Sequence, residues 1–96
     1  MTYYWVVTFE YDPKKSEANK AKHGIDFEEA KQLWSEEKAV EARAASRTES
    51  RFLRVAMLNG KLWSAFFTIR NDNIRIISVR RARTNEERLY DEGADS

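Results

Sequence analysis

The stretch RFLRVAMLNGKLWSAFFTIRNDNIRIISV, residues 51–79, decides the fold. It holds three runs rich in aromatic and β-branched residues, a composition typical of sheet strands. Asn59-Gly60 separates the first two runs and is the strongest short signal for a two-residue hairpin turn. The residues 71–73, NDN, separate the second run from the third. We therefore predict strands over residues 51–58, 61–70 and 74–79, joined as consecutive hairpins.

The two turns also predict which side chains share a sheet face. With a two-residue first turn, Arg51 falls opposite Thr68. If residues 71–72 form a second two-residue turn, Thr68 also lies opposite Arg75, whereas a slip of one residue there would send Arg75 to the other face. Opposed side chains lie about 5 Å apart. The expected result is a row of Arg51, Thr68 and Arg75, with Arg70 nearby on the same face.

Three guanidinium groups near a hydroxyl would make a reasonable phosphate clamp, because arginine donates paired hydrogen bonds to anionic oxygens. The same register predicts that Arg81 joins this row, while Arg80 lies on the other face near Trp63 and can stack on it. The alternative is that these arginines are strand-end charges paired with Glu86 and Glu87.

The residues before the hairpins predict one strand and two helices. Residues 2–11, TYYWVVTFEY, have strand composition. Residues 12–24 predict a helix with Asp12 as N-cap and Gly24 as the closing residue. Residues 25–34 predict a second helix, in which Asp26 and Glu29 form a variant of the capping box.

The remaining segments complete the expected fold. Residues 38–42 form a short strand at best, and residues 43–50 read as a loop. Residues 84–93 predict a last helix, with Thr84 as N-cap, Glu87 three residues on and Gly93 as the stop. This order predicts an α+β domain with helices packed on an antiparallel sheet of about four strands. Both sheet faces are partly apolar, so either a partner covers one of them or the first strand and last helix do.

Composition narrows the class of protein. The 96 residues, 42% of them hydrophobic, suit one folded domain over residues 1–96, and the net charge of +1 gives no indication of nucleic-acid binding. The absence of cysteine excludes disulfides and thiolate chemistry. No His/Cys/Asp cluster has metal-ligand spacing, so we expect neither metal nor cofactor. No apolar run is long enough to span a membrane, which predicts a soluble, cytoplasmic protein.

Two blocks of the sequence resemble a known family. FEYDPKKSEANKAKHGIDFEEA, residues 9–30, and FTIRNDNIRIISVRRARTNEERLYDE, residues 67–92, are similar in order and spacing to the two signatures of the BrnT toxins. The resemblance implies a RelE-like fold and a metal-independent endoribonuclease that inhibits translation and growth as the toxin of a type II toxin–antitoxin system. It also implies a hetero-oligomer with a DNA-binding BrnA-type antitoxin, and contact with operator DNA only through that complex.

Metal-free RNA cleavage requires a group that takes the proton of the attacking 2′-hydroxyl, cations that neutralise the developing charge, and assistance to the leaving oxygen. His23, the only histidine, changes protonation near neutral pH, although it could instead cap the end of its helix. Tyr90 could donate a proton or stack on a base, although such an aromatic is more often a core contact. The catalytic candidates are His23, Arg51, Arg75, Arg80 and Tyr90, and the RNA-binding candidates are Lys22, Thr68, Arg70 and Arg81.

Two other functions remain open. The basic face could dock an acidic segment of a partner, which would make the protein a binding module without catalysis. It could also bind RNA without cutting it, with an affinity that falls as salt rises.

Overall fold

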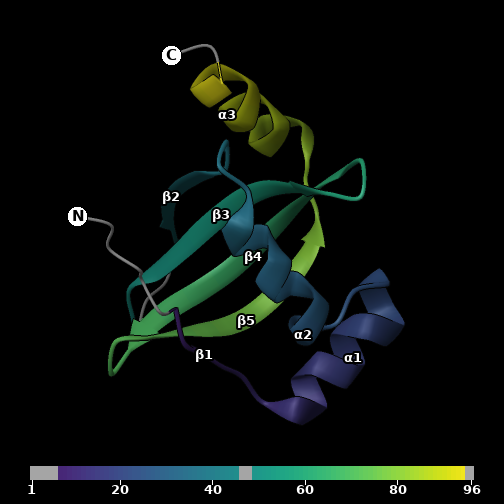
Figure 1. The fold of residues 1–96 in the computed structure, drawn as a ribbon, viewed down its shortest axis with the longest axis vertical. Helices are drawn as coiled ribbons and strands as arrows, with labels where there is room; N and C mark the ends of the chain where they lie inside the picture. The colour runs from purple at the N-terminus through teal and green to yellow at the C-terminus, as the bar shows by residue number, and fades with distance from the viewer. Residues whose placement is uncertain (1–6, 46–48, 95–96) are drawn as a thin grey trace, which may run out of the picture.

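In the computed structural model, which describes residues 7–45 and 49–94, the strands form one mixed sheet of order β1-β5-β4-β3-β2 (Figure 1). The strands are β1 (Phe9–Glu10), β2 (Val40–Ala44), β3 (Arg51–Leu58), β4 (Lys61–Arg70) and β5 (Asn73–Arg81). The helices are α1 (Pro13–His23), α2 (Phe27–Ala30), the 3₁₀ helix η1 (Lys31–Ser35) and α3 (Thr84–Ala94).

The predicted α+β class is confirmed, with five strands where about four were expected. The sheet is mixed because β1 runs parallel to β5, pairing Phe9 with Ile74 and Glu10 with Arg75. Of the predicted first strand, residues 2–11, residues 9–10 form β1, and residues 2–6 lie outside the described part of the chain. Strand composition marks residues that suit a sheet, but a strand also needs an edge to pair with. Among the described residues, β1 and β5 pair at two positions.

Both hairpins form as the sequence predicts, and β3 and β4 have the predicted bounds. The turn residues Asn59 and Gly60 have φ angles of 52° and 76°, and Asn71 and Asp72 have 52° and 66°. Positive φ at both central residues is the conformation of the type I′ turn, whose twist matches that of paired strands. The second turn therefore has two residues, as the arginine row requires.

A β-bulge in β5 changes the register beyond the row. Phe67 pairs with Ile76, but Phe66 pairs with Ser78, so Ile77 is an extra residue without a partner on β4. From this point every side chain of β5 is on the face opposite to the one that strict alternation predicts. Arg80 consequently pairs with Ser64 and Arg81 with Trp63. The prediction that Arg81 joins the row and Arg80 lies near Trp63 was wrong for this reason.

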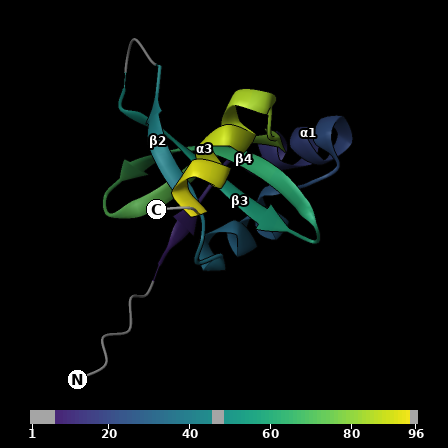
Figure 2. The ribbon, with the colours of Figure 1, turned by 90° about the horizontal axis from the view of Figure 1, so that it is seen from above.

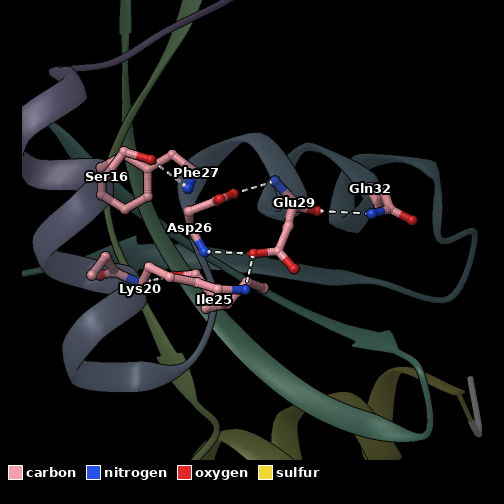
Figure 3. Close-up of polar contacts among 8 residues, drawn as sticks. Ser16, Lys20, Ile25, Asp26, Phe27, Glu29 and Gln32 are labelled. Carbon is pink, nitrogen blue, oxygen red and sulfur yellow. Dashed lines mark hydrogen bonds and ion pairs between the residues drawn. The ribbon is translucent and has the colours of Figure 1, made fainter.

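Capping residues fix the first two helices, and Figure 3 shows those of the second, Asp26 and Glu29. Asp12 accepts a hydrogen bond from Lys14 N, and Gly24, at φ 80°, closes α1 as predicted. Asp26 and Glu29 form the expected capping box, with bonds of 2.7 and 3.1 Å. The predicted second helix is divided into one α-helical turn, α2, and the 3₁₀ turns of η1.

The main core lies between these helices and one face of the sheet, which we call the core face. Figure 1 shows α2 and η1 crossing the sheet, with α1 beyond the edge of β5. The buried apolar cluster comprises Ile25, Phe27, Ala30, Leu33, Ala56, Trp63, Ala65, Ile76 and Val79. Trp34 packs edge to face on Phe9 and Phe67. These contacts hold η1 against the core face at β1 and β4.

Asn19 attaches α1 to the outer edge of β5. Its buried amide donates 2.8 Å hydrogen bonds to the carbonyls of Val79 and Ile25 and accepts one of 3.2 Å from Val79 N. The side chain thus satisfies backbone groups that a neighbouring strand would otherwise bind. Composition gave no sign of this role.

The last helix, α3, covers part of the other sheet face, which we call the arginine face because the row lies on it. Figure 2 shows α3 in front of β3 and beside β2, which are the strands that it contacts. Leu53 and Val55, which point to this face, are buried. The last helix therefore covers apolar surface that could otherwise have required a partner. None of the described helices has the length and apolar character needed to cross a bilayer.

The ends of α3 differ from the prediction. Arg83, not Thr84, is at the N-cap position: its carbonyl accepts from Glu86 N, and its N–H donates to the Glu86 carboxylate at 2.8 Å. Gly93 lies inside α3 and does not stop it. A Cβ at Gly93 would lie 2.5 Å from Cγ2 of Val40, so this glycine permits close approach between α3 and β2.

We expect Gly93→Ala to destabilise the protein by about 1–3 kcal/mol, because the added methyl group would overlap a stiff β-branched side chain. At a helix position without this neighbour the same change would stabilise by about 1 kcal/mol. Urea unfolding would measure the difference. In a Val40→Ala background the penalty should disappear, and a Gly93→Ala protein as stable as the parent would contradict the close approach.

Candidate functional site

The predicted row forms on the arginine face. Thr68 pairs directly with Arg75, as expected. Phe52 pairs with Phe67, so the preceding residue of β3, Arg51, comes beside Thr68 as the ladder continues. The Thr68 hydroxyl donates a 2.7 Å hydrogen bond to the carbonyl of Ser50, which confirms that the two strands are adjacent here.

The guanidinium groups of the row keep donors for a ligand. Arg75 is 3.8 Å from Glu10, an ion pair too long for a hydrogen bond, and its side chain is 32% exposed. Arg51 contacts Glu49 at 3.2 Å through Nε, which leaves its terminal nitrogens outside that contact. Arg70 is exposed at the end of β4. Each arginine has five N–H donors, so the contacts with the described residues leave most of them available.

Glu10 belongs to the row although sequence analysis did not select it. It pairs with Arg75 across the parallel β1–β5 ladder. Its Oε1 is buried and accepts no hydrogen bond from any described group. A carboxylate beside the guanidinium cluster is a group that can accept a proton there. Recognising it required the parallel pairing of β1, which composition does not reveal.

Arg80 lies on the arginine face but is engaged by α3. Its two terminal nitrogens donate to the two carboxylate oxygens of Glu86, at 2.7 and 2.8 Å. The Ser64 hydroxyl donates to the same carboxylate at 2.8 Å, and the Arg80 guanidinium lies 5.0 Å from the ring centre of Phe66. This bidentate pair agrees with the alternative interpretation of the arginines, in which they are strand-end charges that pair with Glu86.

Arg81 lies on the core face, 5.6 Å from the ring centre of Trp63, in the position predicted for Arg80. Its Nε donates to the carbonyl of Leu62 at 3.3 Å, and the residue is exposed. The structure therefore separates Arg81 from the row. Its role in RNA binding stays a prediction.

Tyr90 connects α3 to the segment after η1. Its hydroxyl donates to the Glu36 carboxylate, which also accepts from the backbone N–H of Met57. The hydrogen bond to Glu36 raises the pKa of Tyr90 to about 12. A tyrosine with this pKa gives up its proton less readily than an ordinary one, so its position favours a structural contact. A role for Tyr90 in proton transfer stays a prediction.

Lys22 and His23 lie apart from the row, at the end of α1. Both line a hollow of about 220 Å³, whose far wall includes Ile77 and Ser78 of the bulge. Within the described ranges, residues 7–45 and 49–94, no three His, Asp, Glu or Cys side chains gather as a metal-binding group. The candidate residues near β5 therefore form two groups, the arginine row and the residues that line the hollow.

The sequence was compared with known protein families. The family model described as ribonuclease toxin, BrnT, of type II toxin–antitoxin systems matches residues 11–86. This match covers most of the chain. The chain belongs to the BrnT family.

No curated protein matches the chain. The BrnT match spans α1 to the start of α3, and therefore includes the hairpins, the bulge and Glu86. A type II toxin implies an antitoxin partner, so membership gives the broad class of activity, ribonuclease, and of partner. In this BrnT-family fold, the arginine row and the hollow each bring several cationic side chains together.

The Arg80–Glu86 pair gives the protein a specific response to acid. Burial acts to raise the pKa of Glu86, but hydrogen bonds from Arg80, the Arg83 N–H and Ser64 outweigh it and lower that pKa from 4.5 to about 2. A carboxylate with a lowered pKa stabilises the fold above pH 4.5, and this contribution is lost as the pH falls toward 2.

We expect Glu86→Gln to lower the free energy of unfolding at pH 7 by about 3 kcal/mol, because Arg80 then lacks its counter-charge. Urea unfolding between pH 7 and pH 2.5 would measure this, and the variant should lose less stability than the parent below pH 4.5. The control is Glu87→Gln, which alters the exposed neighbouring carboxylate. If both variants behave alike, the buried pair does not hold α3.

Proposed function

We propose that this BrnT-family protein is a metal-independent endoribonuclease that acts on RNA in the cytoplasm and thereby inhibits translation and growth. In this proposal a BrnA-type DNA-binding antitoxin neutralises it, and operator DNA is contacted only through the toxin–antitoxin complex. One observation carries the proposal: Arg75 is paired with Thr68 on the arginine face, beside Arg51, and among the described residues each of the two guanidinium groups has one carboxylate contact, which leaves donors for a phosphate.

The row suits a phosphate that acquires negative charge. Arg51 and Arg75 would bind its non-bridging oxygens, which stabilises the pentacoordinate transition state formed when the 2′-hydroxyl attacks. Thr68 sits between them, and Arg70 would bind the next phosphate along the chain. The oxygen that leaves is the 5′-oxygen of the following nucleotide. Because the attacking group is the 2′-hydroxyl of the RNA itself, no protein nucleophile is needed.

The attacking hydroxyl must lose its proton, and the leaving oxygen must gain one. Glu10 is the candidate nearest to the row, since it lies beside Arg75. His23 and Tyr90 are the other candidates, and each would need RNA to reach its own part of the surface. A Glu10→Gln variant that binds RNA but does not cut it would identify Glu10 as the proton acceptor.

Arg80 has a different place in this proposal. Because Glu86 binds both of its terminal nitrogens, Arg80 would act as a positioning residue that holds α3 and the end of β5. Lys22 and Arg81 would contact RNA outside the row.

A second function is supported by the carboxylates that already lie near the row. Arg51 contacts Glu49, and Arg75 is close to Glu10, so the same face can receive acidic side chains. A binding module for an acidic partner segment would use the row in this way, without catalysis.

Arg75→Ala distinguishes the two functions. If the row stabilises the transition state, we expect the rate of RNA cleavage to fall by about 100-fold, with antitoxin binding retained. Cleavage of a labelled RNA and a pull-down with the antitoxin would measure the two effects. Arg43→Ala, which removes an exposed arginine of β2, is the matched control. Loss of antitoxin binding, together with a parent protein that cuts no RNA, would support the binding module.

Metal independence has its own test. Cleavage should proceed at an unchanged rate in excess EDTA, because the proposed mechanism uses guanidinium groups where other nucleases use a divalent cation. The same assay with added Mg²⁺ provides the comparison. A rate that collapses in EDTA and returns with Mg²⁺ would contradict the mechanism.

A further inference from the structure

The hollow beside α1 has a composition that the arginine row does not explain. Its lining includes Lys15, Lys22 and His23 from one face of α1, with Ser78 from β5. Among the described residues, none that lines it is acidic. Two lysines and an imidazole therefore face one concave surface with a hydroxyl, which is the chemistry of an anion-binding site.

A second hollow of the same size, about 220 Å³, provides a contrast within the molecule. It lies between the start of α2 and the first hairpin turn, and its lining includes Glu29. That carboxylate binds Lys20 at 2.6 Å, and the one lysine in the lining of this hollow is Lys61. No ion pair is found for Lys15 or Lys22 in the part of the chain that the structure describes. The hollow beside α1 therefore has two lysines, an imidazole and no acidic side chain in its described lining, whereas the second hollow has one lysine and one carboxylate.

The β-bulge forms the wall of this hollow. Ile77 is the extra residue of β5, and a bulge turns a side chain away from the regular alternation. Here Ile77 lines the hollow opposite Ala18 of α1. Their apolar surfaces suit the flat face of a base or a ribose, while the lysines suit a phosphate. The combination matches a nucleotide better than a simple inorganic anion.

The hollow is also close enough to the row to bind the same RNA molecule. Ser78 lies three residues beyond Arg75 on β5, a separation of roughly 10 Å along the strand. β1 covers the edge of β5 only at Ile74 and Arg75, so it does not pair with the stretch between the row and the hollow. An RNA chain held at Arg75 can therefore cross this edge toward α1.

We propose that the hollow beside α1 is a second subsite, which binds the phosphate and sugar or base of a nucleotide flanking the one held by the arginine row. The inference rests on the proposed function and specifies the substrate as a single strand that occupies at least two positions. Lys15 and Ser78 thereby become substrate-binding residues, together with Lys22 and His23. The bulge separates the two subsites by a fixed distance.

The test uses an eight-nucleotide RNA with 2′-O-methyl groups at every ribose, which cannot undergo attack by the 2′-oxygen. His23 is the only histidine, so its Cε1 proton gives one NMR resonance that reports on the hollow. We expect that resonance to shift and saturate with the dissociation constant measured by fluorescence anisotropy. Lys15→Ala and Lys22→Ala should each weaken binding roughly fivefold and lower the salt slope by about 0.7.

Lys14→Ala is the matched control, because Lys14 is the exposed neighbour of Lys15 and does not line the hollow. An unmoved His23 resonance, with Lys15→Ala binding as tightly as Lys14→Ala, would overturn the second subsite. If Arg75→Ala still weakens binding in that case, the proposed function stands without the subsite. If Arg75→Ala also binds like the parent protein, the arginine row fails as the RNA site too.

Discussion

The arrangement of the whole site depends on one irregularity in the sheet, the bulge at Ile77. Before it, the hairpin register places Thr68 against Arg75 on the arginine face. After it, the register is shifted by one residue, so Arg80 points to the arginine face and Arg81 to the core face. A regular strand would have left Arg81 in the row and Arg80 stacked on Trp63. One inserted residue therefore decides which arginine can hold the last helix.

Polar contacts help to attach the last helix, in addition to the apolar surface that it covers at Leu53 and Val55. Glu86 binds Arg80 and Ser64 in a buried cluster, and Tyr90 donates to Glu36. Such contacts are directional, and a buried charge left unpaired is costly, so they fix the position of α3 more strictly than apolar contact would. This fixed position places α3 against β3 and β2. The ion pair therefore helps to determine which part of the arginine face α3 covers.

The sequence was sufficient to predict the parts of the fold that depend on residues close together in the chain. The turn residues Asn59-Gly60 and Asn71-Asp72 predicted both hairpins, and in the structure they adopt the positive φ angles that such turns need. Asp26 with Glu29 predicted the cap of the second helix. It was insufficient where the outcome depends on contacts between distant segments. The bulge, the parallel pairing of β1 and the edge contact of Asn19 each join residues far apart in the chain. The sequence suggested that Gly93 ends the last helix, but the structure shows that a glycine is needed there because Val40 occupies the space of a side chain. The row was predicted because it depends only on turns, and Glu10 was missed because it depends on β1.

The most direct test of this account is to observe the arginine side chains by NMR, in protein labelled on arginine, with and without the 2′-O-methyl RNA. The guanidinium hydrogens of Arg80 should exchange slowly with water in the free protein, since they are bound to Glu86, and should keep their chemical shifts when RNA is added. The resonances of Arg75 and Arg51 should move. Arg80 resonances that move on RNA binding while those of Arg75 stay in place would contradict the division of roles set by the bulge.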